Sequence, residues 1–171
     1  MIMENDISRI LDEALSETTA LLVTIDEKDI NTVPFEGSWT AAQVGRHLLK
    51  AERGMDKLFL GPAESVDRAP DQNVEGLKKM FLDFSTKMQS PEYILPEEKE
   101  YNKEKLISDL QEVRDKVIEA VNAADLTQVP PLPEGNPFIG NTKLELAHFM
   151  AYHSRRHNHQ IKNILEILKS R

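Results

Sequence analysis

The sequence predicts an all-α protein, built as a four-helix bundle with crossover connections and one extra short helix. Three observations lead to this prediction. Apolar residues recur at intervals of three and four, no stretch of useful length alternates like a strand, and two Thr-initiated capping boxes mark helix starts. Helices of this kind bury their apolar stripes against one another around one core. The length of 171 residues favours a single domain over residues 1–171.

Five segments carry the helical period, and each is bounded by residues that start or stop a helix. The first ends before Pro34 and Gly37. The second starts at a capping box made by Thr40 and Gln43, and the last starts at a similar box at Thr142. In chain order the predicted helices cover residues 6–30, 40–60, 73–88, 102–123 and 142–168. The connections at 62–72, 88–101 and 124–141 are long enough for crossovers, so a simple up-down order does not follow.

The composition excludes several classes of function. The chain has 29 acidic and 21 basic residues, and this net charge of −8 argues against nucleic acid and anionic membranes as partners. No apolar run approaches the roughly 18 residues of a transmembrane helix, and the acidic N-terminus lacks the pattern of a signal peptide. These features predict a cytoplasmic protein. The absence of cysteine removes disulfides and thiolate metal sites, so any transition metal must be held by His, carboxylate or water.

Four of the five histidines lie within 12 consecutive residues of the last predicted helix. At about 100° per residue, His153 and His157 fall in the middle of the inward apolar stripe, whereas His148 and His159 point to the opposite side. Two histidines at i and i+4 lie one turn apart, so both rings can reach one metal ion. His47, the remaining histidine, flanks the inward stripe of the second predicted helix and is the candidate third ligand.

Three histidines with open coordination positions are typical of a catalytic or exchangeable divalent metal site. Zinc or nickel suits all-imidazole ligation, copper is a further alternative, and magnesium and calcium are poor matches. Water bound at such a centre has a lowered pKa and is a candidate nucleophile, and an incoming thiol is the alternative occupant. Ala51 and Gly54 lie on the same side as His47, and these small residues predict a pocket for a small-molecule substrate there.

Simpler interpretations of the same residues stay open. His153 and His157 also fit a core in which each neutral imidazole is hydrogen-bonded to its neighbours. Glu145 and His148 have the Glu-x-x-His spacing of di-iron bundles, but such bundles need two copies, and this single copy is predicted to face outward. Gln160 follows His157 by one turn and either orients a water or an imidazole or only lines a polar pocket.

Two short motifs, SWTAAQVGRHL in the second predicted helix and its cap and YHSRRHNHQI in the last, resemble those of the DinB-like (YfiT-like) metalloenzymes. The first is SWTAAQVGRHL at residues 38–48, a Trp-Thr opening followed by a helix with a histidine. The second is YHSRRHNHQI at residues 152–161, which resembles the His-x-x-x-His-x-x-Gln signature of the last helix of that family. Many members read His-Arg-Gly-Gln there, and this chain has Asn158 and His159 in place of the Arg-Gly pair. The order of the motifs and the length match across nearly the whole chain.

The resemblance implies a bundle with crossovers, a homodimer, and a divalent metal, often nickel or zinc, on three histidines, here His47, His153 and His157. For some relatives it also implies S-transfer or isomerisation with a low-molecular-weight thiol. The leading expectation is a metal-dependent enzyme, S-transferase-like or hydrolase-like, acting on a small molecule. The alternatives are a metal- or ligand-binding stress-response bundle without turnover, and a structural bundle that has lost its metal.

Overall fold

The computed structural model describes residues 4–171, and over that range the chain is helical and contains no strand, as predicted. Glu64 and Val129 form an isolated antiparallel bridge between two loops. None of the described helices combines the length and apolarity needed to cross a lipid bilayer. In chain order the elements are α1 (Glu4–Val23), α2 (Ala41–Glu52), α3 (Met55–Leu60), α4 (Val74–Leu82), the short 3-10 helix η1 (Glu92–Ile94), α5 (Lys103–Ala123) and α6 (Lys143–Lys169).

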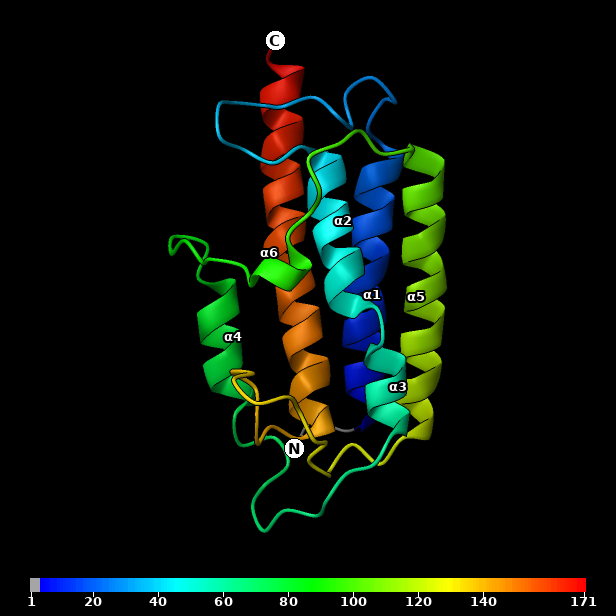
Figure 1. Ribbon diagram of the computed structural model, residues 1–171, viewed down its shortest axis with the longest axis vertical. Coiled ribbons are helices and arrows are strands. Elements are labelled where there is room, and N and C mark those ends of the chain that lie inside the picture. Colours follow the sequence, from blue (N-terminus) through cyan, green and yellow to red (C-terminus); the bar gives the residue numbers. More distant parts are fainter. Residues whose placement is uncertain (1–3) are drawn as a thin grey trace.

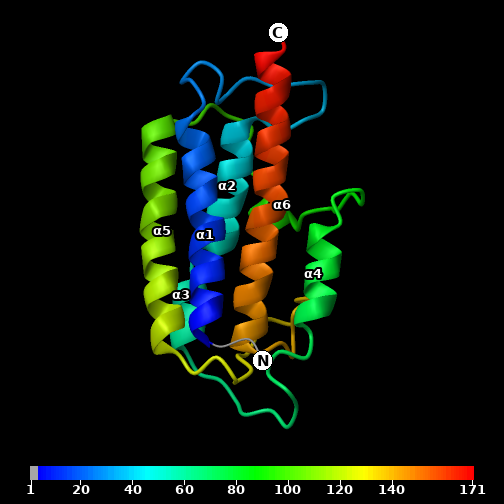
Figure 2. The same cartoon turned by 180° about the vertical axis from the view of Figure 1, so that it is seen from behind.

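Four bundle positions are occupied by α1, by α2 followed by α3, by α5 and by α6 (Figure 1). α1 and α6 lie side by side and run in one direction, while the α2–α3 unit and α5 lie side by side and run in the other (Figures 1 and 2). The connection from α3 to α5 carries α4, which packs on the outside of α6, and η1, which packs on α2. The predicted four-helix bundle with crossover connections and an additional short helix is confirmed.

The segment predicted as one helix from 40 to 60 is two helices, because Gly54 interrupts it. The capping box at its start is present: the Thr40 hydroxyl accepts from the Gln43 N–H at 3.1 Å, and Gln43 Oε1 accepts from the Thr40 N–H at 2.9 Å. α2 then ends at Glu52, and Gly54 has a φ of 86°, in the left-handed region that favours glycine. The chain turns there before α3 begins at Met55.

Two other predicted helices are longer than the observed ones. α1 ends well before residue 30, yet Ile25 and Ile30 stay buried because the turns that follow the helix keep them against the core. The apolar period therefore continues past the end of the helix. α4 ends before Asp83, whose carboxylate accepts a hydrogen bond from the Ser85 backbone N–H at 3.1 Å. Local bonds of this kind compete with the helical ones and stop the helix.

The buried apolar side chains of the bundle form two clusters, one toward each of its ends, and a third, smaller cluster lies between α4 and α6. Four buried polar residues, Thr18, Glu52, Ser154 and Asn158, come between members of the two clusters on α1, α2–α3 and α6; we call them the polar layer. The Thr18 hydroxyl donates to Asn158 Oδ1 at 2.6 Å, and the Ser154 hydroxyl donates to the Glu52 carboxyl at 3.2 Å. Asn158 Nδ2 donates to the Ala14 carbonyl at 3.0 Å, which links α6 to α1.

Candidate metal centre

The structure brings His47, His153 and His157 together between α2 and α6. One ring nitrogen from each lies within 4.8 Å of the other two. The ring centroids are 4.4 Å apart for His47 and His157, 4.7 Å for His153 and His157, and 5.0 Å for His47 and His153. α2 and α6 are neighbours in the bundle (Figure 1), so His47 meets the pair that the helical period placed on the inner stripe of α6. The predicted convergence is observed, and the role of the three residues as ligands stays a prediction.

His47 is fully buried, and its Nδ1 lies 2.9 Å from the carbonyl oxygen of Ile94 in η1. Because a carbonyl only accepts hydrogen bonds, Nδ1 carries the proton and Nε2 keeps its lone pair. Nε2 lies 3.1 Å from Nε2 of His153. Metal-bound histidines usually donate their second N–H in this way. Sequence reasoning missed Ile94 because it contributes a backbone carbonyl, which every residue type has.

The segment that carries Ile94 is fastened to α2 on both sides of His47. Arg46 donates to the Glu97 carboxylate at 3.1 and 3.2 Å. Lys50 Nζ lies 2.9 Å from the same carboxylate and donates to the Leu95 carbonyl at 2.8 Å. The hydrogen bonds from Arg46 and then Lys50 hold the pKa of Glu97 well below its usual range. These contacts fix the position of the acceptor that orients the His47 ring.

His157 is oriented in the same way by a side chain. Its Nδ1 lies 2.8 Å from Gln160 Oε1, so Nδ1 donates and Nε2 keeps its lone pair. Of the roles that the sequence left open for Gln160, the structure shows the one in which it orients an imidazole. The His157 ring also stacks toward Trp39, with the two ring planes 21° apart and the centroids separated by 6.4 Å.

Burial keeps the three imidazoles neutral. Loss of hydration lowers the pKa of His47, lowers that of His153 well below its usual value, and lowers that of His157 to about 3. The charge of Arg156 adds to this effect at His153 and His157. His153 also packs on the ring of Phe149, at a centroid distance of 5.4 Å. Neutral imidazole is the form that ligates metals, so these rings need not lose a proton first.

The donor set, and the spacing of one pair within it, fit a divalent transition metal. Two nitrogens that each lie about 2.0–2.1 Å from one zinc ion, at tetrahedral or right angles, are about 2.9–3.4 Å apart. The Nε2 atoms of His47 and His153 are 3.1 Å apart. Over residues 4–171 the group contains imidazoles and no carboxylate, which suits zinc or nickel and not magnesium or calcium.

A groove of about 910 Å³ opens beside His157. Its walls come from segment 35–39, segment 84–95 and the α6 side chains from Arg156 to Asn163. Ala51 and Gly54 do not line it: Ala51 lies in the last turn of α2, and Gly54 is exposed in the turn that follows. This groove is therefore not the pocket predicted beside these two residues, which stays a prediction.

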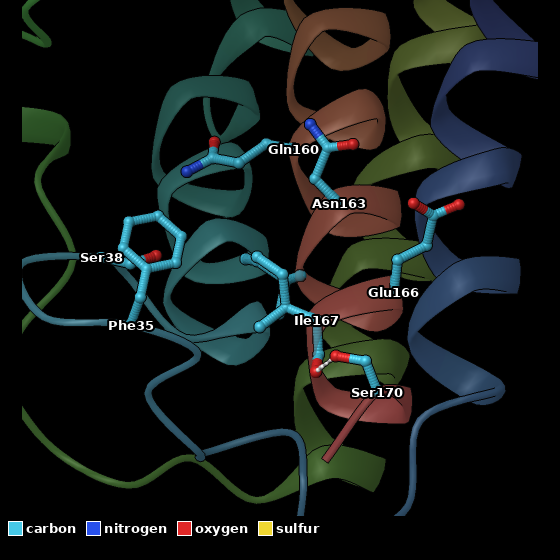
Figure 3. A pocket seen from close by; sticks show the side chains of 8 residues that line it. Phe35, Ser38, Gln160, Asn163, Glu166, Ile167 and Ser170 are labelled. Atoms are coloured by element: carbon cyan, nitrogen blue, oxygen red, sulfur yellow. Dashed lines mark hydrogen bonds between the residues drawn. The ribbon is translucent and has the colours of Figure 1, made fainter.

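A smaller cavity of about 500 Å³ continues along α6 from this groove (Figure 3). The two share Phe35, Ser38, Gln160 and Asn163. Figure 3 shows Gln160 and Asn163 next to each other on α6. Phe35 lies on one side of them, and Glu166 lies on the other side and points away from Phe35. The polar groups do not converge on one point, so we treat this cavity as an extension of the groove.

His148 is fully buried, and its prediction as an outward residue is wrong. The helical phase is correct, since His148 lies outside the three-histidine group, but α4 covers part of α6 there (Figure 2). Its Nδ1 lies 3.2 Å from the Tyr152 hydroxyl. Within the described part of the chain its Nε2 has no hydrogen-bond partner.

Glu145, the partner of His148 in the Glu-x-x-His spacing, is also buried rather than outward. Its carboxylate accepts hydrogen bonds from Arg68 at 2.7 and 3.2 Å, from the Asn73 N–H at 2.6 Å and from the Thr142 N–H at 2.8 Å. These bonds fill the acceptor positions of the carboxylate and tie the loop before α4 to the start of α6. Glu145, the glutamate of the Glu-x-x-His spacing, therefore has a structural role as an acceptor of these bonds.

Asn158 and His159, which stand in place of the Arg-Gly pair of the family motif, lie on two different sides of α6. Asn158 belongs to the polar layer and contacts α1. His159 stacks on Phe84, with the centroids 4.2 Å apart and the planes 8° apart, in the wall of the groove. The departure from the motif therefore changes the packing of α6 and one wall of the groove, while Gln160 still orients His157.

Comparisons with known proteins agree with this arrangement. A family model described as the DinB superfamily matches residues 10–161, which include all three histidines. The fold is similar to that of YfiT from Bacillus subtilis, with a TM-score of 0.64 and 14% identity over 97% of this chain and 87% of that chain. That protein is described as a probable metal-dependent hydrolase with an unusual four-helix bundle topology. No curated protein matches the chain significantly.

Proposed function

Because the chain belongs to the DinB superfamily, we propose that it is a metal-dependent enzyme that acts on a small molecule at a centre held by His47, His153 and His157. The observation that carries the proposal is the orientation of the imidazoles. At His47 and His157 the Nδ1–H is bound to an oxygen, at 2.9 and 2.8 Å, which leaves Nε2 for a metal. Both rings are therefore held with a free lone pair on the side where the three imidazoles meet, which is the arrangement that a metal centre needs.

The groove beside His157 supports a role in catalysis rather than in structure alone. His47 is fully buried, and His153 is 9% exposed. His157 borders the groove, so a substrate reaches the centre from that side. A divalent metal bound there supplies Lewis acidity and lowers the pKa of a bound water or thiol. The chain contributes three neutral ligands, the acceptors that orient two of them, and a recess next to the third.

We propose zinc or nickel as the metal and two reaction classes, hydrolysis by water and transfer from a low-molecular-weight thiol. The all-imidazole donor set supports the choice of metal. The description of YfiT supports the first reaction class, and the family resemblance of the two motifs supports the second. A groove of about 910 Å³ is in the range of small-molecule sites.

A second candidate function is favoured by the same 3.1 Å separation between His47 and His153. That distance also suits an N–H···N hydrogen bond when His153 carries its proton on Nε2. In that case the chain is a ligand-binding or structural bundle whose histidines satisfy one another without a metal.

Elemental analysis of the untagged protein tests the proposal. We expect close to one equivalent of zinc or nickel per chain, loss of the metal in chelator, and turnover of an ester or of a thiol-acceptor pair that returns with the metal. Protein that is purified without metal, binds none on titration and is equally stable in chelator would establish the second candidate. Stoichiometric metal without turnover would leave a metal-binding module.

We further propose that the protein is a cytoplasmic homodimer without a nucleic-acid or membrane partner. The net charge of −8 supports the last two points. The family resemblance of the two motifs supports the dimer, and large apolar side chains that are more than half exposed, among them Met80, Tyr93 and Ile139, are available for contact with a second copy. Sedimentation of the untagged protein over a range of concentrations tests the dimer.

A further inference from the structure

Arg156 stands at the edge of the groove, directly before His157 in α6. Its guanidinium reaches the end of α4 and the residues after it. It donates to the Phe81 carbonyl at 3.3 Å, to the Asp83 carbonyl at 2.8 Å and to the Thr86 carbonyl. These three acceptors hold a positive charge in one place beside the candidate metal centre.

The charge of Arg156 is not neutralised by an ion pair among residues 4–171. Its hydrogen-bond partners are neutral carbonyls. The carboxylate of Asp83 accepts hydrogen bonds from the hydroxyls of Ser85 and Thr86, at 2.5 and 2.9 Å; these bonds lower its pKa, and the nearby charge of Arg156 adds to the effect without a direct ion pair. A guanidinium has five N–H donors, so two remain beyond these three bonds.

The groove differs in charge from the chain as a whole. The protein has a net charge of −8, yet the residues lining the groove include two cations, Arg156 and Lys87, and one carboxylate, Glu92. The rest of the lining is rich in flat or apolar side chains, including Phe35, Trp39 and Phe84. An acidic protein that gathers cations and aromatic rings in one recess favours an amphipathic anion there.

We propose that the groove takes small organic anions with an aromatic or similarly flat apolar body, and that Arg156 binds their anionic group beside the metal centre. This inference rests on the proposed function, since the anion is the substrate or part of it. The aromatic walls hold the body of the molecule, and the remaining N–H groups of Arg156 bind its acidic oxygens. Charge-assisted bonds of this kind are about twice as strong as neutral ones, so Arg156 sets the preference for a charged ligand.

A purely structural role for Arg156 makes a different prediction. An arginine at the end of a helix also binds the last carbonyls and so fastens α4 to α6. If that were its whole role, removing Arg156 would lower the affinity of the groove for every ligand by a similar factor, whether the ligand is charged or neutral. The ratio of the affinities for an anion and for a neutral molecule of the same shape separates the two roles.

Trp39 provides the measurement, because it is the single tryptophan of the chain and lines the groove. Its fluorescence is titrated with phenylmethanesulfonate and with benzyl methyl sulfone, a neutral molecule of similar shape. Sulfonates are poor metal ligands, and the titrations use both the purified protein and chelator-treated protein. A preference for the sulfonate over the sulfone that is measured in chelator-treated protein does not depend on metal binding or on turnover. The result can therefore contradict this inference without contradicting the proposed function, and the reverse.

We expect the wild type to bind the sulfonate about tenfold more tightly than the sulfone at low salt, and Arg156→Gln to reduce the preference to less than twofold. Arg156→Lys should keep most of it, because the charge remains even though lysine cannot reach three carbonyls. Lys162→Gln is the matched control: it removes one charge from the same helix, where Lys162 pairs with Glu17 at 2.6 Å away from the groove. It should leave the preference unchanged.

Three results would overturn the inference. The first is that the wild type binds neither probe, or binds the sulfonate no more tightly than the sulfone. The second is that Arg156→Gln lowers both affinities by the same factor. The third is that Lys87→Gln, and not Arg156→Gln, abolishes the preference.

Discussion

The Nε2 atoms of His47 and His153 lie 3.1 Å apart although the two residues are separated by 106 positions in the chain. This contact joins α2 to α6 and exists only when the bundle is closed. A metal bound at this point would bridge the two helices. Because the unfolded chain has no such preformed site, metal binding and folding should be coupled.

His153→Ala should abolish stoichiometric metal binding. Removal of one of three ligands should cost more than the roughly 10–100-fold loss that follows the loss of an outer partner. Metal content and zinc competition titrations measure the effect. His148→Ala is the control, because it removes a buried histidine of the same helix that lies outside the three-histidine group. Equal metal content in wild type and His153→Ala would refute the ligand assignment.

Gln160→Leu should weaken metal binding by about 10–100-fold without removing a ligand. The variant loses the acceptor that holds the Nδ1–H of His157 at 2.8 Å, so the ring is free to turn. Asn163→Leu changes a neighbouring amide on the same side of α6, which contacts His159, and should have little effect. The same zinc titration compares the two variants. If both lose affinity equally, the effect lies in the groove rather than in the orientation of His157.

Glu52→Gln should make the stability of the fold less sensitive to a rise in pH from about 5 to 8. Burial raises the pKa of Glu52 from 4.5 to about 8. Between these values the folded chain keeps a proton that the unfolded chain has lost, so the free energy of unfolding falls as pH rises. The loss is up to about 1.4 kcal/mol per pH unit in this window. The glutamine variant lacks this loss, so its stability relative to wild type should rise between pH 5 and pH 8.

Urea unfolding at several pH values measures this difference. Glu112→Gln, which changes an exposed carboxylate on α5 paired with Lys116, should follow the wild type more closely. A Glu52→Gln curve parallel to the wild type would mean that the carboxyl is already ionised in the folded state.

Two glycines should respond to alanine in opposite directions. Gly54 has a φ of 86°, so Gly54→Ala should lower the free energy of unfolding by about 1–2 kcal/mol. Gly76 lies within α4, and a methyl group added to its Cα would enter open space, so Gly76→Ala should raise it by about 0.5–1 kcal/mol. Urea titration of both variants provides the test. Stabilisation by Gly54→Ala would show that α2 and α3 can join into one helix.

Much of the candidate centre could be predicted from local sequence. The helical period placed His153 and His157 on one inner stripe, and the capping boxes at Thr40 and Thr142 marked the starts of the two helices that meet there. Periods and caps depend on residues only a few positions apart. The position of His47 opposite that pair followed from the packing of α2 against α6.

The remainder depended on contacts between distant segments. Gly54 looked like a tolerated glycine inside a helix, because sequence does not show its φ. The burial of His148 and Glu145 follows from the loop and helix that cover the start of α6, and these come more than 60 positions earlier. The acceptor for His47 is a backbone carbonyl in a connection whose course across α2 no residue pattern revealed.

The polar layer has a consequence for how the helices are aligned along their axes. A slip of α6 by one turn would move it about 5.4 Å and place the Asn158 amide opposite apolar side chains, with its bonds to Thr18 and Ala14 broken. Ser154 and Asn158 each follow one of the histidines of the centre in the sequence. The layer therefore fixes the register in which His153 and His157 meet His47. Apolar residues at these positions would pack as well in several registers, and only one of those registers brings the three imidazoles to one point.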